Sequence, residues 1–415
     1  MSFVLAVLFV VFLLLGLPIA LAIGSATMAA LHLQGMPLMV VPQQMFAGIN
    51  SFALVAVPMF VLAGDVMAQG QVSRRLVAFA DSLFGFLKGG LSIASILAGM
   101  FFAAISGSGA ATTAAVGSSL VPELKRKGYD PAAAASLIAA SGTIGVVIPP
   151  SVPMIIYAVI AQESVADLFL SGVLPGLAMG VGLAVIAILQ AYRRSYPRGT
   201  AFSLRMIGRT LLSASWGLIT PIIILGGIFS GVFTPSEAAV VAVNYAILVS
   251  LFVYRDQTLA DLYRLIVRAG VTTAVIMFVI SASAVLSWTL SSWQVPGAIA
   301  AFVLSLSTNT WILLLLILLL ILATGVFIET ASALIILTPI LLPLALQIGL
   351  DPVHFGVVLV VGLAIGMVTP PVAINLFVAS SITGLPLQAI ARAVLPYLLT
   401  LVGVLLLVAY GPLLI

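Results

Sequence analysis

Gly142-Thr-Ile-Gly-Val-Val-Ile-Pro-Pro150 and Leu363-Ala-Ile-Gly-Met-Val-Thr-Pro-Pro371 are two copies of one pattern, 221 residues apart. The same offset continues beyond them without an insertion, so that Pro122 aligns with Pro343. The matched residues are mostly glycine and proline, which determine the conformation of the backbone. The chain therefore contains an internal repeat in which a backbone conformation is duplicated.

The composition predicts that this repeat lies in a membrane. Of the 415 residues, 63% are hydrophobic and 6% are charged, whereas roughly 25% of the residues of a soluble domain are charged. The mean hydropathy is +1.34, and apolar runs of spanning length recur along the chain. This predicts an all-α polytopic membrane protein. In such a chain, two copies of a helix interrupted by Gly and Pro indicate the binding site of a transporter.

Missing residue types and motifs exclude several other functions. The chain has no cysteine, so a disulfide, a thiolate nucleophile and a cysteine metal site are excluded. The net charge of +4 does not indicate nucleic-acid binding, because the basic residues lie in short loops between apolar runs. Ser106-Gly-Ser-Gly109 resembles part of a phosphate loop, but the Walker lysine and a strand are missing, so no ATP site is expected.

The basic residues predict the orientation of the helices. They cluster in the loops that we place in the cytoplasm, namely Arg74-Arg75 with Lys88, Lys125-Arg126-Lys127, Arg193 to Arg209, and Arg255 to Arg268. The turn at residues 122–131 of the first copy has three cations, and the corresponding turn at residues 343–352 has none. By the positive-inside rule the two copies face opposite sides of the membrane, which predicts an inverted repeat.

Apolar runs predict the spanning segments. The first run, Phe3–Ile23, lacks a small-residue cleavage site and is expected to remain as a helix. Segment Gln71–Phe86 is more mixed and is expected to be an amphipathic connector. The other predicted spans are Ala26–Val41, Ser51–Ala68, Pro131–Ile160, Asp167–Tyr192, Leu211–Ile228, Ser236–Tyr254, Thr272–Leu290, Pro296–Leu306, Pro352–Ser380 and Leu387–Leu414.

Two apolar segments predict re-entrant hairpins. The segment between Lys88 and Lys125 has both ends on the cytoplasmic side and Ser106-Gly-Ser-Gly109 at its centre. Its second copy, Trp311–Gly349, has Thr324-Gly-Val-Phe-Ile-Glu-Thr330 near its centre. Such helix-breaking tips occur at membrane depth only where they are buried in protein or line a wet cavity. The alternative is that the Ser-Gly tip is only a close helix-packing patch.

The Pro-Pro pairs predict breaks in two helices, because two successive prolines cannot continue a regular helix. Carbonyl groups before each break are expected to lose their intrahelical partners, and a bound hard cation would satisfy them. The alternative is a structural kink without a ligand. Two cation sites are predicted: one between Ser106, Ser108 and Gly142, Gly145, Ile148, Pro150, and one between Thr324, Gly325 and Gly366, Thr369, Pro371.

Few charged residues remain inside the apolar segments. Glu329 lies at the second tip, where an ionisable group is a functional candidate, and the alternative is a carboxyl group that locks the tip. Glu237, Asp130 and Asp351 stand at helix starts and are expected to be caps. His32 and His354 are far apart in the sequence and predict no metal site.

The sequence resembles the large membrane subunit (DctM-like) of tripartite ATP-independent periplasmic (TRAP) transporters over nearly its whole length. The resemblance implies a sodium-driven elevator importer in the bacterial inner membrane, with a scaffold and a mobile transport domain. It also implies a small four-helix membrane subunit and a periplasmic binding protein that delivers an organic acid. The family often has Asp where this chain has Glu329. The motifs that carry the resemblance are Val57–Gly64, Ile105–Gly109, Gly128–Pro131, Ile148–Pro153, Gly231–Ala238, Gly325–Glu329, Leu337–Pro343 and Gly366–Pro371.

Repeat and resemblance together predict a multi-pass transporter with periplasmic termini that uses Na⁺ and no ATP. Scaffold segments are expected at residues 1–87 and 193–308, and transport-domain repeats at 88–192 and 309–415. Membrane lipid surrounds the chain, and nucleic acid is not a partner. The rival interpretation is a self-sufficient sodium-coupled dicarboxylate or ion transporter; a membrane-embedded enzyme is disfavoured because no cluster of His, Asp, Glu or Cys appears. The small organic anion is expected between the tips, near Thr112, Ser151, Glu329 and Asn375.

Overall fold

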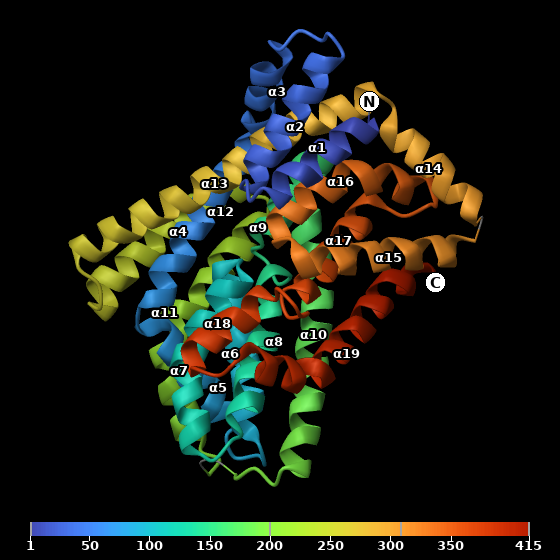
Figure 1. Ribbon diagram of the computed structural model, residues 1–415. Helices are drawn as coiled ribbons and strands as arrows, with labels where there is room; N and C mark the ends of the chain where they lie inside the picture. The colour runs from blue at the N-terminus through green and yellow to red at the C-terminus, as the bar shows by residue number, and fades with distance from the viewer. Residues whose placement is uncertain (1, 199–200, 308, 414–415) are drawn as a thin grey trace.

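The computed structural model describes residues 2–198, 201–307 and 309–413, which form helices joined by short turns (Figure 1). Within these residues the only β-pairing is an isolated bridge between Lys88 and Arg198. Eight of the described helices are long and apolar enough to cross a membrane. The α-helices are α1 (Ser2–Leu14), α2 (Ile19–Leu33), α3 (Val40–Ile49), α4 (Ala56–Gln69), α5 (Gln71–Phe84), α6 (Gly90–Ser106), α7 (Gly109–Arg126), α8 (Pro131–Thr143), α9 (Val152–Ala161), α10 (Val165–Arg193), α11 (Leu204–Phe229), α12 (Pro235–Leu248), α13 (Leu259–Ser292), α14 (Val295–Leu306), α15 (Thr310–Phe327), α16 (Thr330–Gln347), α17 (Pro352–Gly366), α18 (Ile374–Thr383) and α19 (Leu387–Tyr410).

The N-terminal region differs from the prediction. The predicted single span Phe3–Ile23 is wrong: α1 ends at Leu14, and α2 begins only at Ile19. Gly16 has a φ of +82°, which glycine tolerates, and Pro18 precedes the new helix. The predicted span Ala26–Val41 is also wrong, because α2 ends at Leu33 and α3 begins at Val40. Helices of 13, 15 and 10 residues are shorter than the ~20 residues that a bilayer requires.

Later boundaries also shift. Helix α13 begins at Leu259, so Arg264 and Arg268 lie on its first turns and not in a loop as predicted. Its start is set by Thr258, whose side chain accepts from the Asp261 N–H while Asp261 accepts from the Thr258 N–H. Helix α12 continues as a π-helical segment over Val249–Tyr254. The predicted end of the last span at Leu414 and the predicted segment boundary at residue 308 lie outside the described residues.

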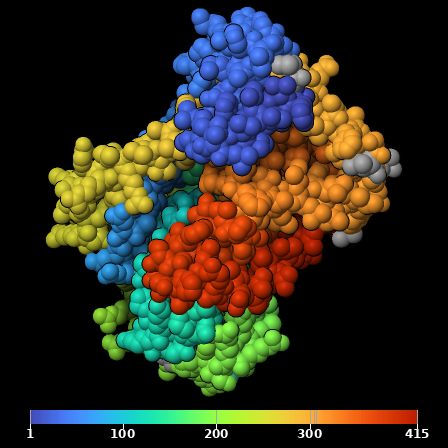
Figure 2. Space-filling model, viewed as in Figure 1, coloured from blue at the N-terminus to red at the C-terminus, as the bar shows by residue number. Residues whose placement is uncertain are grey.

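The helices pack as two intermixed groups. In the first group α4 packs on α12, α5 on α11, and α2 and α3 on α13, which joins the two segments predicted to be scaffold. In the second, α10 packs on α19 and α17, and α18 packs on α7 and α8, which joins the two predicted transport repeats. Figure 2 shows the first helices at one end of the molecule and the C-terminal quarter across its middle. The division into a fixed and a mobile body remains a prediction.

Helix α5, the predicted amphipathic connector, is buried along one face and packs between α6 and α11. The Arg75 guanidinium donates to the Ser213 Oγ at 3.2 Å and lies 4.1 Å from the centre of the Tyr254 ring. A cation over an aromatic face is attracted by the ring quadrupole. The connector is therefore tied to two helices of the second half of the chain.

The two broken helices run in opposite directions. The first passes from α8 through a short 3₁₀ segment, Ile144–Val146, to α9, and the second passes from α17 to α18. Near the end of α9, the Tyr157 Oη donates to the carbonyl of Pro352 at the start of α17 at 2.6 Å. At the other end, the Lys125 Nζ donates to the carbonyl of Thr383, where α18 ends, at 3.2 Å. This antiparallel arrangement is the one expected of an inverted repeat.

Candidate functional site: two hairpin tips against two helix breaks

The first tip joins α6 to α7 through two residues, Gly107 and Ser108. Gly107 has a φ of +60°, and Ser108 caps α7 by accepting from the Ala111 N–H. The Thr112 Oγ1 lies 2.8 Å from the Ser108 carbonyl oxygen, to which it donates, and 3.0 Å from the Ser106 Oγ. Ser106 is buried and Thr112 is fully buried. The tip is thus a closed cluster of hydroxyl and carbonyl oxygens.

The first break lies between η2 (Ile144–Val146) and α9. It contains the cis bond Pro149-Pro150. Ser151 follows, fully buried; its hydroxyl donates to the Val146 carbonyl and accepts from the Met154 N–H at 3.3 Å. Ser151 therefore caps α9 and ties the two halves of the broken helix together.

The first tip lies directly on the first break. A Cβ at Gly145 would lie 2.5 Å from the Thr112 Oγ1 and 2.7 Å from the Ser108 carbonyl oxygen. A Cβ at Gly107 would lie 2.7 Å from the Pro150 carbonyl oxygen. Real Cβ atoms do not approach so closely, so these positions require glycine. The structure brings Ser106, Ser108, Gly145 and Pro150 into one region, as the sequence predicted.

The second tip has a different cap. Helix α15 ends at Phe327, and the Oε2 of Glu329 caps α16 by accepting from the Ser332 N–H at 3.1 Å. The Glu329 side chain is exposed. This contact is the one that the locking interpretation of Glu329 requires, since a carboxylate at a helix N-terminus satisfies free backbone N–H groups.

The second tip region also lies on its break. A Cβ at Gly366 would overlap the backbone of Gly325, so α15 and α17 touch through backbone atoms. The break contains the cis bond Pro370-Pro371. Thr324 and Thr369 donate their hydroxyls to carbonyls one turn earlier in their own helices, at 2.8 Å each. The structure therefore brings together the residues of the second predicted pair of segments.

The expectation about free carbonyl groups is only partly met. It is wrong for Gly366, whose carbonyl accepts from the Thr369 N–H at 3.1 Å. It is wrong also for Gly142, whose carbonyl is a partner of the Ile144 N–H in the last turn of α8. Among the described residues, no donor reaches the carbonyls of Gly145 and Ile148. The chain tightens into 3₁₀-type turns before each proline pair, which satisfies part of the backbone.

A residue of the second repeat completes the first junction. Asn375, at the start of α18, is fully buried and its Nδ2 donates to the Ala139 carbonyl of α8 at 3.2 Å. Its backbone N–H donates to the Met367 carbonyl at 2.9 Å. Its Oδ1 has no partner among the described residues. A buried acceptor without a donor costs about 1–3 kcal/mol, and a bound cation would satisfy it.

Sequence reasoning missed two residues of this junction. The Thr113 hydroxyl faces Gly142 and donates to the Gly109 carbonyl at 2.9 Å. The Met367 side chain lies against Gly109, where a Cβ would be 2.8 Å from its methyl group. The neighbouring Thr112 was a signal for Thr113, but nothing in the pattern indicated that Met367 crosses from one repeat to the other.

The predicted substrate residues do not form one open surface. Thr112, Ser151 and Asn375 have 0% exposure, and the first two use their hydroxyls inside the first junction. Only Glu329 is exposed. In the structure, therefore, Thr112 and Ser151 are buried and use their hydroxyls to stabilise the tip and the break.

The groups that could bind a ligand at the two junctions are oxygens. Hydroxyl, amide and carbonyl oxygens surround both junctions, and among the described residues no group of three His, Cys, Asp or Glu could hold a metal ion. Hard cations prefer such oxygen ligands, whereas structural zinc sites are built mainly from Cys and His. The carbonyls of Gly145 and Ile148 and the Asn375 Oδ1 are the oxygens that remain available.

Helices of membrane-spanning length, with two tips seated on two antiparallel broken helices, define a repeat-built membrane transporter. The chain belongs to the family of the DctM component of tripartite ATP-independent periplasmic transporters, whose family model matches residues 6–414. The resemblance derived from the motifs is thereby confirmed.

Relatives of this chain are named transporter permeases. It is 42% identical to the C4-dicarboxylate TRAP transporter large permease protein DctM of Pseudomonas aeruginosa, over 89% of this chain and 86% of that one. It is 41% identical to the isethionate TRAP transporter permease protein DctMQ of Oleidesulfovibrio alaskensis, over 97% of this chain but only 64% of the relative's length. It is 38% identical to the sialic acid TRAP transporter large permease protein SiaM of Vibrio cholerae, over 89% and 87% of the two chains.

A solved structure shares the fold. The YdaH transporter of Alcanivorax borkumensis superposes with a TM-score of 0.64, covering 89% of this chain and 87% of that one, at 16% sequence identity. This likeness shows the fold alone.

Proposed function

We propose that this chain is the large membrane subunit of a sodium-coupled TRAP importer of a small organic acid, in the bacterial inner membrane. The observation that carries the proposal is the pairing of each hairpin tip with the break of its own repeat, with oxygen donors between them. We place one cation site at each junction. The first, around Ser108 and Gly145, has oxygens without donors, and the second, around Thr324 and Gly366, is proposed from the repeat.

The substrate class comes from the relatives, which are named for C4-dicarboxylates, isethionate and sialic acid. Each name denotes an organic anion. The substrate would lie between the tips, next to Glu329, which is the exposed residue of the predicted substrate set. Asn375 is fully buried and would contribute to the first cation site. Bound sodium ions would offset the charge of the anion there.

The proposal includes two partners. A small four-helix membrane subunit would cover lipid-facing helices, and a periplasmic binding protein would deliver the substrate. The fused relative DctMQ, of which this chain spans 64%, supports the first partner, because its extra length leaves room for another subunit. Transport would occur by movement of the tip-and-break core against the scaffold helices.

Uptake of labelled organic acids into proteoliposomes tests the proposal. The chain, its small subunit and the binding protein are expected to require an inward Na⁺ gradient and no ATP. Uptake driven by ATP without Na⁺, or by a proton gradient alone, would refute sodium coupling. Uptake by the chain without a binding protein would instead favour the self-sufficient transporter.

A further inference from the structure

One end of the described molecule has acidic side chains but no lysine or arginine. Glu163 follows the end of α9, and Asp351 precedes Pro352, whose carbonyl accepts from Tyr157 of the same helix α9. Glu237 opens α12 next to Ser236, which donates to the Phe52 carbonyl at 2.8 Å. In Figure 1 the ends of α7 and α10, which carry basic residues, lie at the bottom, and α3 lies at the top.

The Lys and Arg residues of the chain lie elsewhere. They occur on α5 and the turn after it, at the ends of α7 and α10, in the turn after α10, at the starts of α11 and α19, and from Arg255 to Arg268. On α13, Ser283 follows Arg268 by 15 residues, which corresponds to about 22 Å along a helix at 1.5 Å per residue. The acidic end is thus well separated from the basic one, and the orientation proposed above places it in the periplasm.

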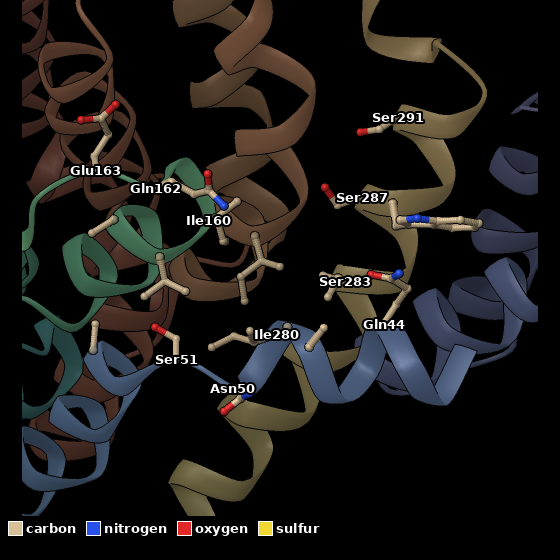
Figure 3. Close-up of a pocket in the computed structure, with 18 of the residues that line it drawn as sticks. Gln44, Asn50, Ser51, Ile160, Gln162, Glu163, Ile280, Ser283, Ser287 and Ser291 are labelled. Carbon is tan, nitrogen blue, oxygen red and sulfur yellow. The ribbon is translucent and has the colours of Figure 1, made fainter. Parts of the chain in front are cut away.

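A cavity of about 680 Å³ opens at this acidic end. Helices α3 and α13 form one wall, and the α9–α10 turn with Ile335 of α16 forms the other. Figure 3 shows Ser283, Ser287 and Ser291 along α13, with Gln162 on the opposite wall. Their spacing of four residues places the three serines on one face of the helix. Neither hairpin tip lines this cavity, so it is separate from the two junctions.

Ser283 is an independent sign of an occupant. Its side chain is 3% exposed and lines the cavity, yet its Oγ has no hydrogen-bond partner among the described residues. Other serines of the chain, such as Ser95, donate to a carbonyl one turn earlier. A ligand with hydrogen-bonding groups would satisfy this hydroxyl.

The charge of the lining selects the occupant. Glu163 is the sole charged side chain among the described residues that line the cavity, and serine hydroxyls, amide groups and the indole of Trp288 supply the rest of the polar lining. A carboxylate without a nearby cation repels an organic anion and attracts an ammonium or guanidinium group. The cavity therefore does not fit the transported acid, but it fits a basic side chain.

We propose that this cavity receives a loop of the periplasmic binding protein that carries Lys or Arg. The inference rests on the proposed function, since it takes the orientation and the partner from it. The bound loop would place its cation beside Glu163 and its backbone amides against the serines of α13. Because the cavity has walls from α13 and from the start of α10, the loop would contact both groups of helices at once.

Charged thiol reagents test the cavity without the partner. The chain has no cysteine, so Ser287→Cys introduces a single thiol, and exposed Ser305→Cys on α14 is the control. Each thiol is labelled with two methanethiosulfonate reagents, one with a cationic trimethylammonium group and one with an anionic sulfonate group. The rate constant of each reagent with the protein is divided by its rate constant with free 2-mercaptoethanol. We expect the cationic reagent to react at least about fivefold faster at Ser287→Cys, equivalent to about 1 kcal/mol at 1.4 kcal/mol per decade. Adding Glu163→Gln should bring this ratio close to one. Equal normalised rates of the two reagents at Ser287→Cys, with Glu163 intact, would refute the proposal that the cavity accepts a cation.

The binding protein itself supplies the second arm. It is expected to slow the labelling of Ser287→Cys, and Glu163→Arg is expected to raise by about tenfold the concentration of binding protein that gives half-maximal uptake. Asp167→Asn, on the same end but outside the cavity lining, should change that concentration less than twofold. Unslowed labelling, or equal effects of the two variants, would refute the docking site. Absence of sodium-driven uptake in the wild-type chain would refute the proposed function instead, so the two failures are distinguishable.

Discussion

Substitution of Gly145 by alanine is the sharpest test of the first junction. The new Cβ would lie 2.5 Å from the Thr112 Oγ1 and 2.7 Å from the Ser108 carbonyl oxygen. Contacts between carbon and oxygen need more than 3 Å, so the tip has to move away from the break by several tenths of an ångström. The carbonyls and hydroxyls that face each other across this contact would then be too far apart to bind one ion together.

The size of the effect follows from the packing. Overpacking by one methyl group costs typically about 1–3 kcal/mol. If the bound ion requires the tip and the break to be in contact, this cost reduces the free energy of Na⁺ binding. The apparent Na⁺ affinity then decreases by roughly 5- to 150-fold at 1.4 kcal/mol per decade. Since the Ser108 obstacle is backbone, Thr112→Ala combined with Gly145→Ala should restore only part of the affinity.

The assay is the Na⁺ concentration that gives half-maximal uptake in proteoliposomes, together with the rise of the melting temperature on addition of Na⁺. The second measurement does not depend on transport. Gly226→Ala, on α11, is the matched control because no atom lies within 4 Å of its new Cβ. If Gly145→Ala keeps both the wild-type Na⁺ dependence of uptake and the wild-type thermal shift, the first junction does not bind sodium.

Substitutions at three further positions separate stability from transport. Gly366→Ala should reduce the yield of folded protein in size-exclusion chromatography. Its Cβ would overlap the Gly325 backbone, which cannot rotate away as a side chain can. A monodisperse variant with a normal melting temperature would contradict this packing. Glu329→Gln should keep the α16 cap and change stability little while uptake falls sharply, whereas Glu329→Ala should also lose about 1 kcal/mol of stability with the cap. Wild-type uptake by Glu329→Gln would leave a structural role only. Tyr157→Phe should lower stability by about 0.5–1.5 kcal/mol, because it removes the hydrogen bond to the Pro352 carbonyl between the repeats; unchanged thermal unfolding would show that this bond contributes nothing.

The junctions were predictable because glycine and proline indicate directly which backbone conformation a position adopts. The offset of the repeat identified both breaks and both tips, and the structure places Gly145 beside Ser108 and Gly366 beside Gly325. The two N-terminal spans that failed were predicted from hydropathy, which averages over a window and overlooks a turn. Gly16 and Pro18 were visible in the sequence, yet the apolar residues around them favoured one continuous span.

The contacts and the burial of individual side chains were harder to predict. Thr112 and Asn375 are polar residues near a predicted site, and this alone suggested contact with the substrate. Their burial depends on how the two repeats pack, with Asn375 crossing to α8 and Met367 crossing to Gly109. A local pattern has no information about such contacts, because the partners are separated by more than half of the chain.

The crossing of Asn375 to Ala139 also has a consequence for biosynthesis. The two residues are 236 positions apart, and a ribosome that adds roughly 5–20 residues per second needs roughly 10–50 s to synthesise that interval. During this time α8 and its broken continuation have already emerged, but the amide that contacts them does not yet exist. The insertion machinery must therefore shelter an unfinished polar break from lipid until the last quarter of the chain arrives, and a nascent chain stalled before residue 375 should be a preferred target of membrane proteases.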